Sequence, residues 1–431
     1  MNKQIFRSSL LNEEVVCYTM DNGLRLYVLS KSEFSTRFAL FGTRFGSIDT
    51  DFSINAEEMR HVPAGIAHFL EHKMFENEEA DAFERYNKTG ASANAYTSFD
   101  RTCYLFQCSD RFYESYDILL DFVQSPYFTP QTVQKEQGII GQEIGMYDDD
   151  GEWQVFMNAL RALYRVHPVN IDIAGTKESI AKITADDLYA CHTAFYHPSN
   201  MFICVVGNED PDTIAEFTRQ RIRDRAQVTV CKKEYEEPRE IAQREIVATS
   251  EVSHPLFTLA YKERCDAAVV DLKERLCFAL LLDILCSSRS PLYKKMVDQK
   301  LINATFSTSV FYGRGYFAAM FGGESNDPYA VQREIETEIE RLRKEGVSSD
   351  AFEASRRQLY AARIRRFDSA EEAADCLVSA ALNGEDPYAA LEFYRTVTLQ
   401  DVQQILAKTL DNRYCAMSIV NPMRQEELEC K

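Results

Sequence analysis

The chain has 431 residues, of which 45% are hydrophobic and 27% are charged. This composition is typical of globular proteins and excludes a chain that stays disordered. A single hydrophobic core rarely extends beyond about 250–300 residues, so the length predicts at least two domains. The formal net charge of −19 disfavours nucleic acids and anionic membranes as partners of the surface as a whole.

Twelve cysteines are spread irregularly along the chain, without a C-x-x-C pair. The opening segment MNKQIFRSSLLNEEVV lacks the apolar stretch of a signal peptide. The longest aliphatic run, at 276–282, is much shorter than the roughly 20 residues that a membrane helix needs. These features predict a cytoplasmic protein whose thiols are reduced and mostly buried.

In chain order, the first half alternates strand and helix patterns. The pair Asn22-Gly23 ahead of the alternating segment LRLYVLS predicts a β-hairpin. The segment ASANAYTSFDRTCYLFQC predicts two strands joined at Phe99-Asp100, and RFALFGTRFGSID and MFICVVGN predict two more. Helices are predicted at about 65–75, 81–87, 111–124, 130–147, 151–163 and 184–194.

Residues 221–245 are dense in charge and predict a linker with room for one exposed strand. After it the same order of elements recurs. The strand LFTLAYK precedes a helix at 273–286, which is followed by the strands ATFSTSVFYG and YFAAMFGGES. Helices at 329–345, 349–366, 370–382 and 399–410 and the strand YCAMSIVN complete the pattern. The sequence therefore predicts two similar α+β domains, 1–220 and 246–431.

One short motif carries the chemistry: His68-Phe69-Leu70-Glu71-His72. On a helix at 100° per residue, His68 and His72 lie one turn apart on the same face, where both imidazoles can reach a common zinc ion. Glu71 lies between them and can activate water without being a ligand. The alternative is a helix whose polar face is simply solvated.

A catalytic zinc site has three protein ligands, and the third is expected on a separate element. The segment QKEQGIIGQEIGMYDDD supplies Glu136 and Glu143, which are two helical turns apart and share a face. Glu143 is the candidate ligand, and Glu136 is the candidate partner of a ligand histidine. Ile139, Ile140 and Ile144 lie off that face and are expected to pack inward.

The motif has the inverted order His-x-x-Glu-His, and the surrounding VPAGIAHFLEHKMFE resembles the pitrilysin/insulysin family of zinc peptidases. GASANAYTSFDRTCYLF and EQGIIGQEIGMYDDDGEW resemble the edge-strand region and the third-ligand helix of that family, and the likeness covers most of residues 15–210. It implies two similar α+β domains, each an antiparallel-rich sheet with helices, that form half of a clam-shaped chamber. It also implies a peptide substrate bound as an added strand at Asn94 and Ala95.

The resemblance is incomplete in the second half. Active family members place an arginine and a tyrosine after a segment like SSRSPLYKK, and here Val297 and Ala304 stand at those positions. We therefore expect a zinc-dependent endopeptidase that needs a homologous partner chain, as a heterodimer or a homodimer, to bind its substrate. Some family members serve only as scaffolds, so the alternative is a non-catalytic subunit of a peptidase-like complex.

Overall fold

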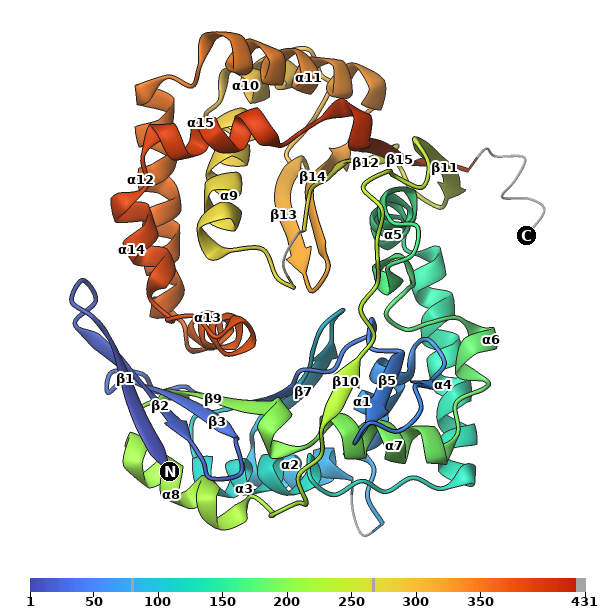
Figure 1. Ribbon diagram of the computed structural model, residues 1–431, viewed down its shortest axis with the longest axis vertical. Helices are drawn as coiled ribbons and strands as arrows, with labels where there is room; N and C mark the ends of the chain where they lie inside the picture. The colour runs from blue at the N-terminus through green and yellow to red at the C-terminus, as the bar shows by residue number, and fades with distance from the viewer. Residues whose placement is uncertain (79–80, 266–267, 424–431) are drawn as a thin grey trace. The chain divides into compact units, whose positions relative to one another are not determined.

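The computed structural model describes residues 1–78, 81–265 and 268–423. It divides into two compact units, each built from separate stretches of chain (Figure 1). The first unit comprises 1–142, 172–233 and 362–389, and the second comprises 143–171, 234–361 and the described part of 390–431. Both units are mixed α+β structures, as the sequence predicts.

The first unit is built on a seven-stranded sheet in the order β1-β2-β3-β9-β4-β8-β7. All neighbouring strands are antiparallel except β3 and β9. The predicted hairpin joins β2 to β3, and Gly23 has the positive φ of +88° that its turn requires. The strands are β1 (Asn2–Ser8), β2 (Glu13–Thr19), β3 (Arg25–Ser30), β4 (Arg37–Thr43), β7 (Ser92–Thr97), β8 (Thr102–Cys108) and β9 (Met201–Gly207).

Helices cover both faces of this sheet, and Figure 1 shows α13 on one side and α2, α3 and α8 on the other. A separate small sheet has the order β10-β5-β6, with β5 (Asp51–Ile54), β6 (Arg60–His61) and β10 (Val230–Lys232). The helices are α1 (Ile66–Phe75), α2 (Ala82–Thr89), α3 (Phe112–Phe122), the start of α4 (Pro130–Asp149), α6 (Lys177–Ile180), α7 (Ala185–Phe195), α8 (Pro211–Arg221) and α13 (Ala370–Asn383), with short 3₁₀ turns at Pro198–Asn200 and Arg366–Asp368.

The second unit repeats this plan with a five-stranded sheet in the order β11-β15-β12-β14-β13. Its strands are β11 (Glu245–Ser250), β12 (Leu256–Lys262), β13 (Ser307–Gly313), β14 (Tyr316–Glu324) and β15 (Cys415–Pro422). Its helices are the end of α4, α5 (Gly151–Leu163), α9 (Leu272–Cys286), α10 (Pro291–Asp298), α11 (Pro328–Glu345), α12 (Ser349–Arg365), α14 (Ala389–Thr396) and α15 (Leu399–Lys408), with 3₁₀ turns at Pro168–Asn170 and Asn412–Tyr414.

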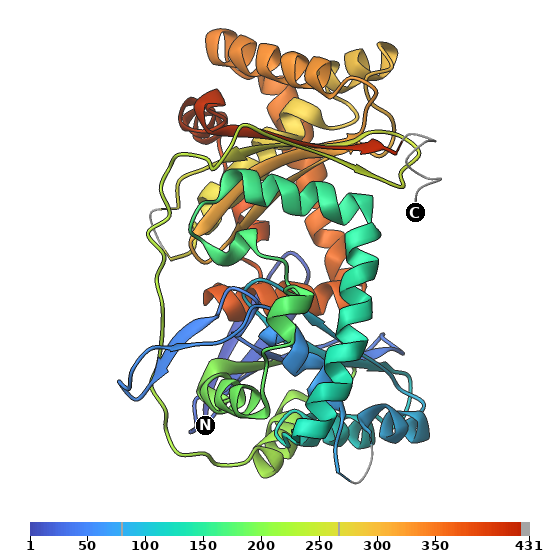
Figure 2. The same ribbon diagram turned by 90° about the vertical axis from the view of Figure 1, so that its right-hand side faces the viewer.

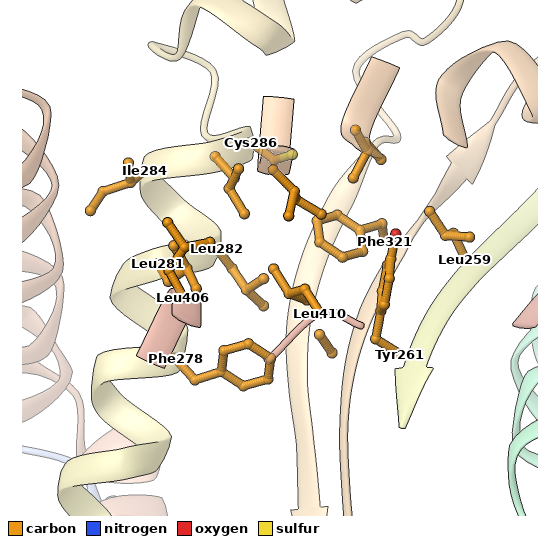
Figure 3. Close-up of a cluster of buried hydrophobic side chains, with 14 of the residues drawn as sticks. Leu259, Tyr261, Phe278, Leu281, Leu282, Ile284, Cys286, Phe321, Leu406 and Leu410 are labelled. Atoms are coloured by element: carbon orange, nitrogen blue, oxygen red, sulfur yellow. The ribbon is translucent and has the colours of Figure 1, made fainter. Parts of the chain in front are cut away.

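The core of the second unit lies between its sheet and α9. Figure 3 shows Phe278 and Leu281 of α9 facing Tyr261 and Phe321 of the sheet, with Leu410 between them. All five side chains are fully buried. Burying each of the aliphatic or phenyl groups contributes about 1.5–3 kcal/mol, so this cluster is a major source of stability.

Each sheet is covered on one face by a helix from the other half of the sequence. In the first unit α13 packs on β9 and β4, although along the chain it comes after four of the five strands of the second unit's sheet. In the second unit α5 packs on β12 and β15, although it precedes the charge-dense segment. The two halves therefore exchange helices, which the sequence pattern did not predict.

The later part of the charge-dense segment is held on the second unit by buried ion pairs. Glu237 accepts hydrogen bonds from the backbone N–H groups of 165–167 and pairs with Lys262, which is 4% exposed. The Glu263 carboxylate, 5% exposed, accepts a hydrogen bond of 2.7 Å from the backbone N–H of Leu410 and lies 3.5 Å from Arg239. Burial raises the pKa of Glu263 to about 7.

We expect Glu263→Gln to stabilise the protein more at alkaline pH than at acidic pH, each compared with the wild type at the same pH. Because the folded pKa is raised above the ordinary value of 4.5, the unfolded chain ionises first, and the free energy of unfolding falls as pH rises from about 4.5 through 7. The glutamine does not ionise and so removes this loss. The free energy of unfolding of the variant minus that of the wild type should therefore grow by about 2 kcal/mol from pH 5 to pH 8. Urea unfolding at both pH values measures it, and a difference that does not change with pH would contradict the assignment.

No single described helix is long and apolar enough to cross a membrane. The helices α9 and α10, which meet at a bend of 42°, are long and apolar enough only when the two are taken together.

Candidate metal and catalytic site

The helix α1 carries the His-x-x-Glu-His motif and is fixed at its first turn. Gly65 precedes it with a φ of +89°, and a Cβ there would lie 2.4 Å from the carbonyl oxygen of Ala174. A side chain at position 65 would therefore force the start of the helix away from its neighbour. The Ser179 hydroxyl donates to the Ala64 carbonyl at 2.8 Å and holds the same approach.

The predicted faces of α1 are correct, and much of the polar face is buried as well. Ile66, Phe69, Leu70 and Met74 are buried on the apolar side, as predicted. On the polar side His68 and Glu71 are each only 8% exposed. Burying a carboxylate beside an imidazole is costly unless both are satisfied by partners. A fully solvated polar face does not account for the burial of His68 and Glu71.

His72 is oriented by Glu136 of α4. Its Nδ1 lies 3.0 Å from Glu136 Oε1, so Nδ1 donates and the lone pair of Nε2 is left for another partner. This arrangement of carboxylate and imidazole is typical of metal-binding histidines. The His68 and His72 rings are 4.6 Å apart between centroids and inclined at 62°.

Glu143 lies two turns beyond Glu136 on α4, a single uninterrupted helix (Figure 2). One ligand atom from each of His68, His72 and Glu143 lies within 4.8 Å of the others. These three residues could hold a zinc ion, which takes imidazole nitrogen and carboxylate oxygen at about 2.0–2.2 Å. Two imidazoles and one carboxylate are also a ligand set that catalytic zinc uses, so the residues fit this metal.

The packing of α4 agrees with prediction except at one residue. Ile140 and Ile144 are fully and almost fully buried. The prediction that Ile139 packs inward is wrong, because its side chain is 46% exposed. Ile139 lies about 100° around the helix from Ile140, and that rotation carries it past the buried side.

Glu71 has a partner that the sequence did not identify. The Thr97 hydroxyl on β7 donates to Glu71 Oε2 at 2.7 Å and thereby fixes the direction of the carboxylate. The neighbouring Thr102 hydroxyl donates to the Phe45 carbonyl at 2.9 Å. A threonine in a strand is so common that no local signal distinguishes Thr97, and only the fold brings it to α1.

The strand β7 is the edge strand of its sheet among the described residues, because it pairs only with β8. Asn94 is exposed on β7, and Ala95 is half-buried. Of the remaining histidines, three are buried: His167 and His192 meet backbone carbonyls, and His197 meets the Ser199 hydroxyl. Val297 lies on α10 and is 40% exposed.

Two family models match successive parts of the chain. The family model described as insulinase, peptidase family M16, matches residues 58–177. The model described as the peptidase M16 inactive domain matches residues 182–359. The chain is 37% identical over 406 residues to the uncharacterized zinc protease YmfH of Bacillus subtilis, and the match covers 93% of this chain and 95% of that protein.

Two solved structures share the fold. A protein of Alicyclobacillus acidocaldarius described as an M16-like peptidase has a TM-score of 0.91 and 31% identity, covering 95% of this chain and 99% of that one. The first half of the periplasmic protease PqqL of Escherichia coli has a TM-score of 0.71 and 17% identity, covering 97% of this chain and 93% of that half. The family models and the long match to YmfH together show that the chain belongs to the insulinase family, peptidase family M16.

Proposed function

We propose that this protein is a zinc-dependent endopeptidase. The observation that supports it most is the convergence of His68, His72 and Glu143 within 4.8 Å beside Glu71, a buried carboxylate on the same helix as the two histidines. Three ligands leave a position open for water or substrate, which a catalytic site needs and a structural zinc site lacks.

Each residue of the candidate site has a separate role in peptide hydrolysis. A bound zinc ion would supply a Lewis acid that acidifies water and polarises the scissile carbonyl. Glu71 accepts the proton of the attacking water and passes it to the leaving amine. Thr97, at 2.7 Å, keeps the Glu71 carboxylate aimed in one direction. Glu136, at 3.0 Å from His72 Nδ1, fixes the ligand tautomer of that histidine.

The substrate is proposed to bind as an extended peptide along β7. An edge strand offers unpaired backbone groups, and a peptide can satisfy them by adding one more strand. Asn94 and Ala95 lie on this strand, only a few residues before Thr97. A peptide held there would run past the carboxylate that Thr97 contacts.

The second candidate is a non-catalytic scaffold. The match of residues 182–359 to a domain described as inactive would support it. The metal-site residues, however, all fall within residues 58–177, which match the insulinase model instead. A scaffold has no need to bury Glu71 next to two histidines, so we favour the peptidase. We also propose a cytoplasmic location, since most of the cysteines within the described residues are buried as free thiols.

We further propose that the active form contains a second homologous chain. The chain matches one half of PqqL, and the second unit carries Val297 and Ala304 where the family resemblance implies substrate-binding side chains. Contacts of that kind position the scissile bond, and an error of about 1 Å can reduce the rate about 10²-fold.

We expect the purified chain alone to cleave peptides slowly, and a homologous partner to raise the rate by about 10²-fold. The measurement is cleavage of a quenched fluorogenic peptide library, with and without a candidate homologous chain. A chelator should abolish the activity, and zinc should restore it. Rapid turnover by the chain alone, unchanged by any partner, would contradict the two-chain proposal. Complete absence of chelator-sensitive cleavage in every mixture would contradict the peptidase itself.

A further inference from the structure

The candidate ligand Glu143 has a hydrogen-bond partner on its own helix. Tyr147, one turn further along α4, donates its hydroxyl to Glu143 Oε1 at 3.1 Å. A carboxylate that uses one oxygen for a metal ion still has the other oxygen available to accept a hydrogen bond. A bond from Tyr147 is therefore compatible with a role of Glu143 as a metal ligand.

Tyr147 is itself held in place by an aromatic chain. Its ring lies 5.7 Å from the Trp153 ring, and Trp153 lies 5.6 Å from Phe156. Phe156 meets Phe311 of β13 edge-on at 5.6 Å. Each distance is within the range of favourable aromatic pairs. The chain of rings connects the hydroxyl beside Glu143 to the sheet of the second unit.

The position of Trp153 relative to α4 is also fixed by the backbone. Asp150 separates α4 from α5, which turns away from it (Figure 2). The Asp150 side chain accepts hydrogen bonds from the backbone N–H groups of Glu152 and Trp153 at 2.9 and 3.1 Å. This N-cap sets the start of α5 and with it the location of the indole.

We infer that Tyr147 is a positioning residue for Glu143, and that Trp153 responds to occupancy of the metal site through Tyr147. The inference rests on the proposed zinc site. Tyr147 is 37% exposed, so burial of its ring alone does not explain why the hydroxyl is placed beside Glu143. The hydroxyl instead helps to fix the direction of the ligand carboxylate.

Removing the Tyr147 hydroxyl should weaken zinc binding by about tenfold, the lower end of the range for partners that orient metal ligands. The variant is Tyr147→Phe, which keeps the ring against Trp153. Zinc affinity is measured by competition with a chromophoric chelator. Tyr329→Phe is the matched control, because Tyr329 is 45% exposed and its hydroxyl also bonds to a glutamate, Glu245, outside the metal site. The control should bind zinc like the wild type.

The second readout uses the only tryptophan of the chain, Trp153. Titrating the metal-free wild type with zinc should change the emission of Trp153 and saturate at one equivalent. The change should be reduced in Tyr147→Phe. In a Glu143→Gln background, Tyr147→Phe should have almost no further effect on zinc affinity, because the two residues act as a pair.

The outcomes separate this inference from the proposed function. If the wild type binds one zinc through His72 but Tyr147→Phe binds it equally well, the positioning role is overturned and the metal site stands. The same follows if the effects of Tyr147→Phe and Glu143→Gln are additive. If the wild type binds no zinc, the proposed site fails and this inference fails with it.

Discussion

Replacing Glu71 by glutamine is expected to abolish peptide hydrolysis and to leave the metal in place. Glutamine keeps the size of the side chain and can still accept the Thr97 hydroxyl bond of 2.7 Å, but it cannot accept the proton of the attacking water. General-base catalysis contributes about 10²–10⁴-fold, so kcat/KM should fall by at least that range. Zinc content should stay at about one ion per chain, because Glu71 is outside the three-ligand group.

The measurement pairs a fluorogenic peptide assay with elemental analysis of the same preparations. Glu84→Gln on α2, an exposed carboxylate outside the site, serves as the control and should match the wild type in both. Retention of full activity by Glu71→Gln would show that another group takes the proton.

Replacing His72 by alanine is expected to remove the metal almost completely. The substitution keeps two of the three ligands. It also removes the hydrogen-bond partner of Glu136, whose carboxylate lies 3.0 Å from His72 Nδ1. Zinc content should fall from about one ion per chain to a small fraction of that. His61→Ala is the control, because this histidine has a side chain that is 73% exposed on β6 and pairs with Asp51.

The carboxylates should give a graded series in the same experiment. Glu143→Gln should weaken zinc strongly, because a neutral amide replaces a ligand. Glu136→Gln should weaken it less, by about 10–100-fold, because Glu136 only orients His72. Unchanged metal content in His72→Ala, or equal effects of the two glutamines, would contradict the assigned roles.

Much of the fold could be predicted because its signals are local. The Asn22-Gly23 turn, the alternating strands and the amphipathic helix α1 each depend on residues that are close in sequence. The exchange of α5 and α13 between the two sheets could not be predicted in this way. Both helices are apolar enough to pack on either sheet, and only long-range packing decides which one they cover.

The candidate site likewise has one part that local spacing predicts and one part that depends on long-range packing. Helical spacing was enough to place His68, Glu71 and His72 on one face, and to place Glu136 with Glu143 on another helix. The approach of Thr97 to Glu71 depends on the pairing of β7 with β8 and carried no signal in the sequence. The sequence also carried no sign that part of the charge-dense segment is buried. The Glu237 side chain of that segment is buried only because it pairs with Lys262 of β12.

The metal itself can be located most directly by X-ray diffraction from crystals of the purified protein, with data recorded on both sides of the zinc absorption edge. The proposed site predicts one anomalous difference peak per chain, bonded to His68, His72 and a carboxylate oxygen of Glu143 at about 2.0–2.2 Å. The absence of such a peak in protein crystallised with zinc, or a peak bonded to other residues, would contradict it.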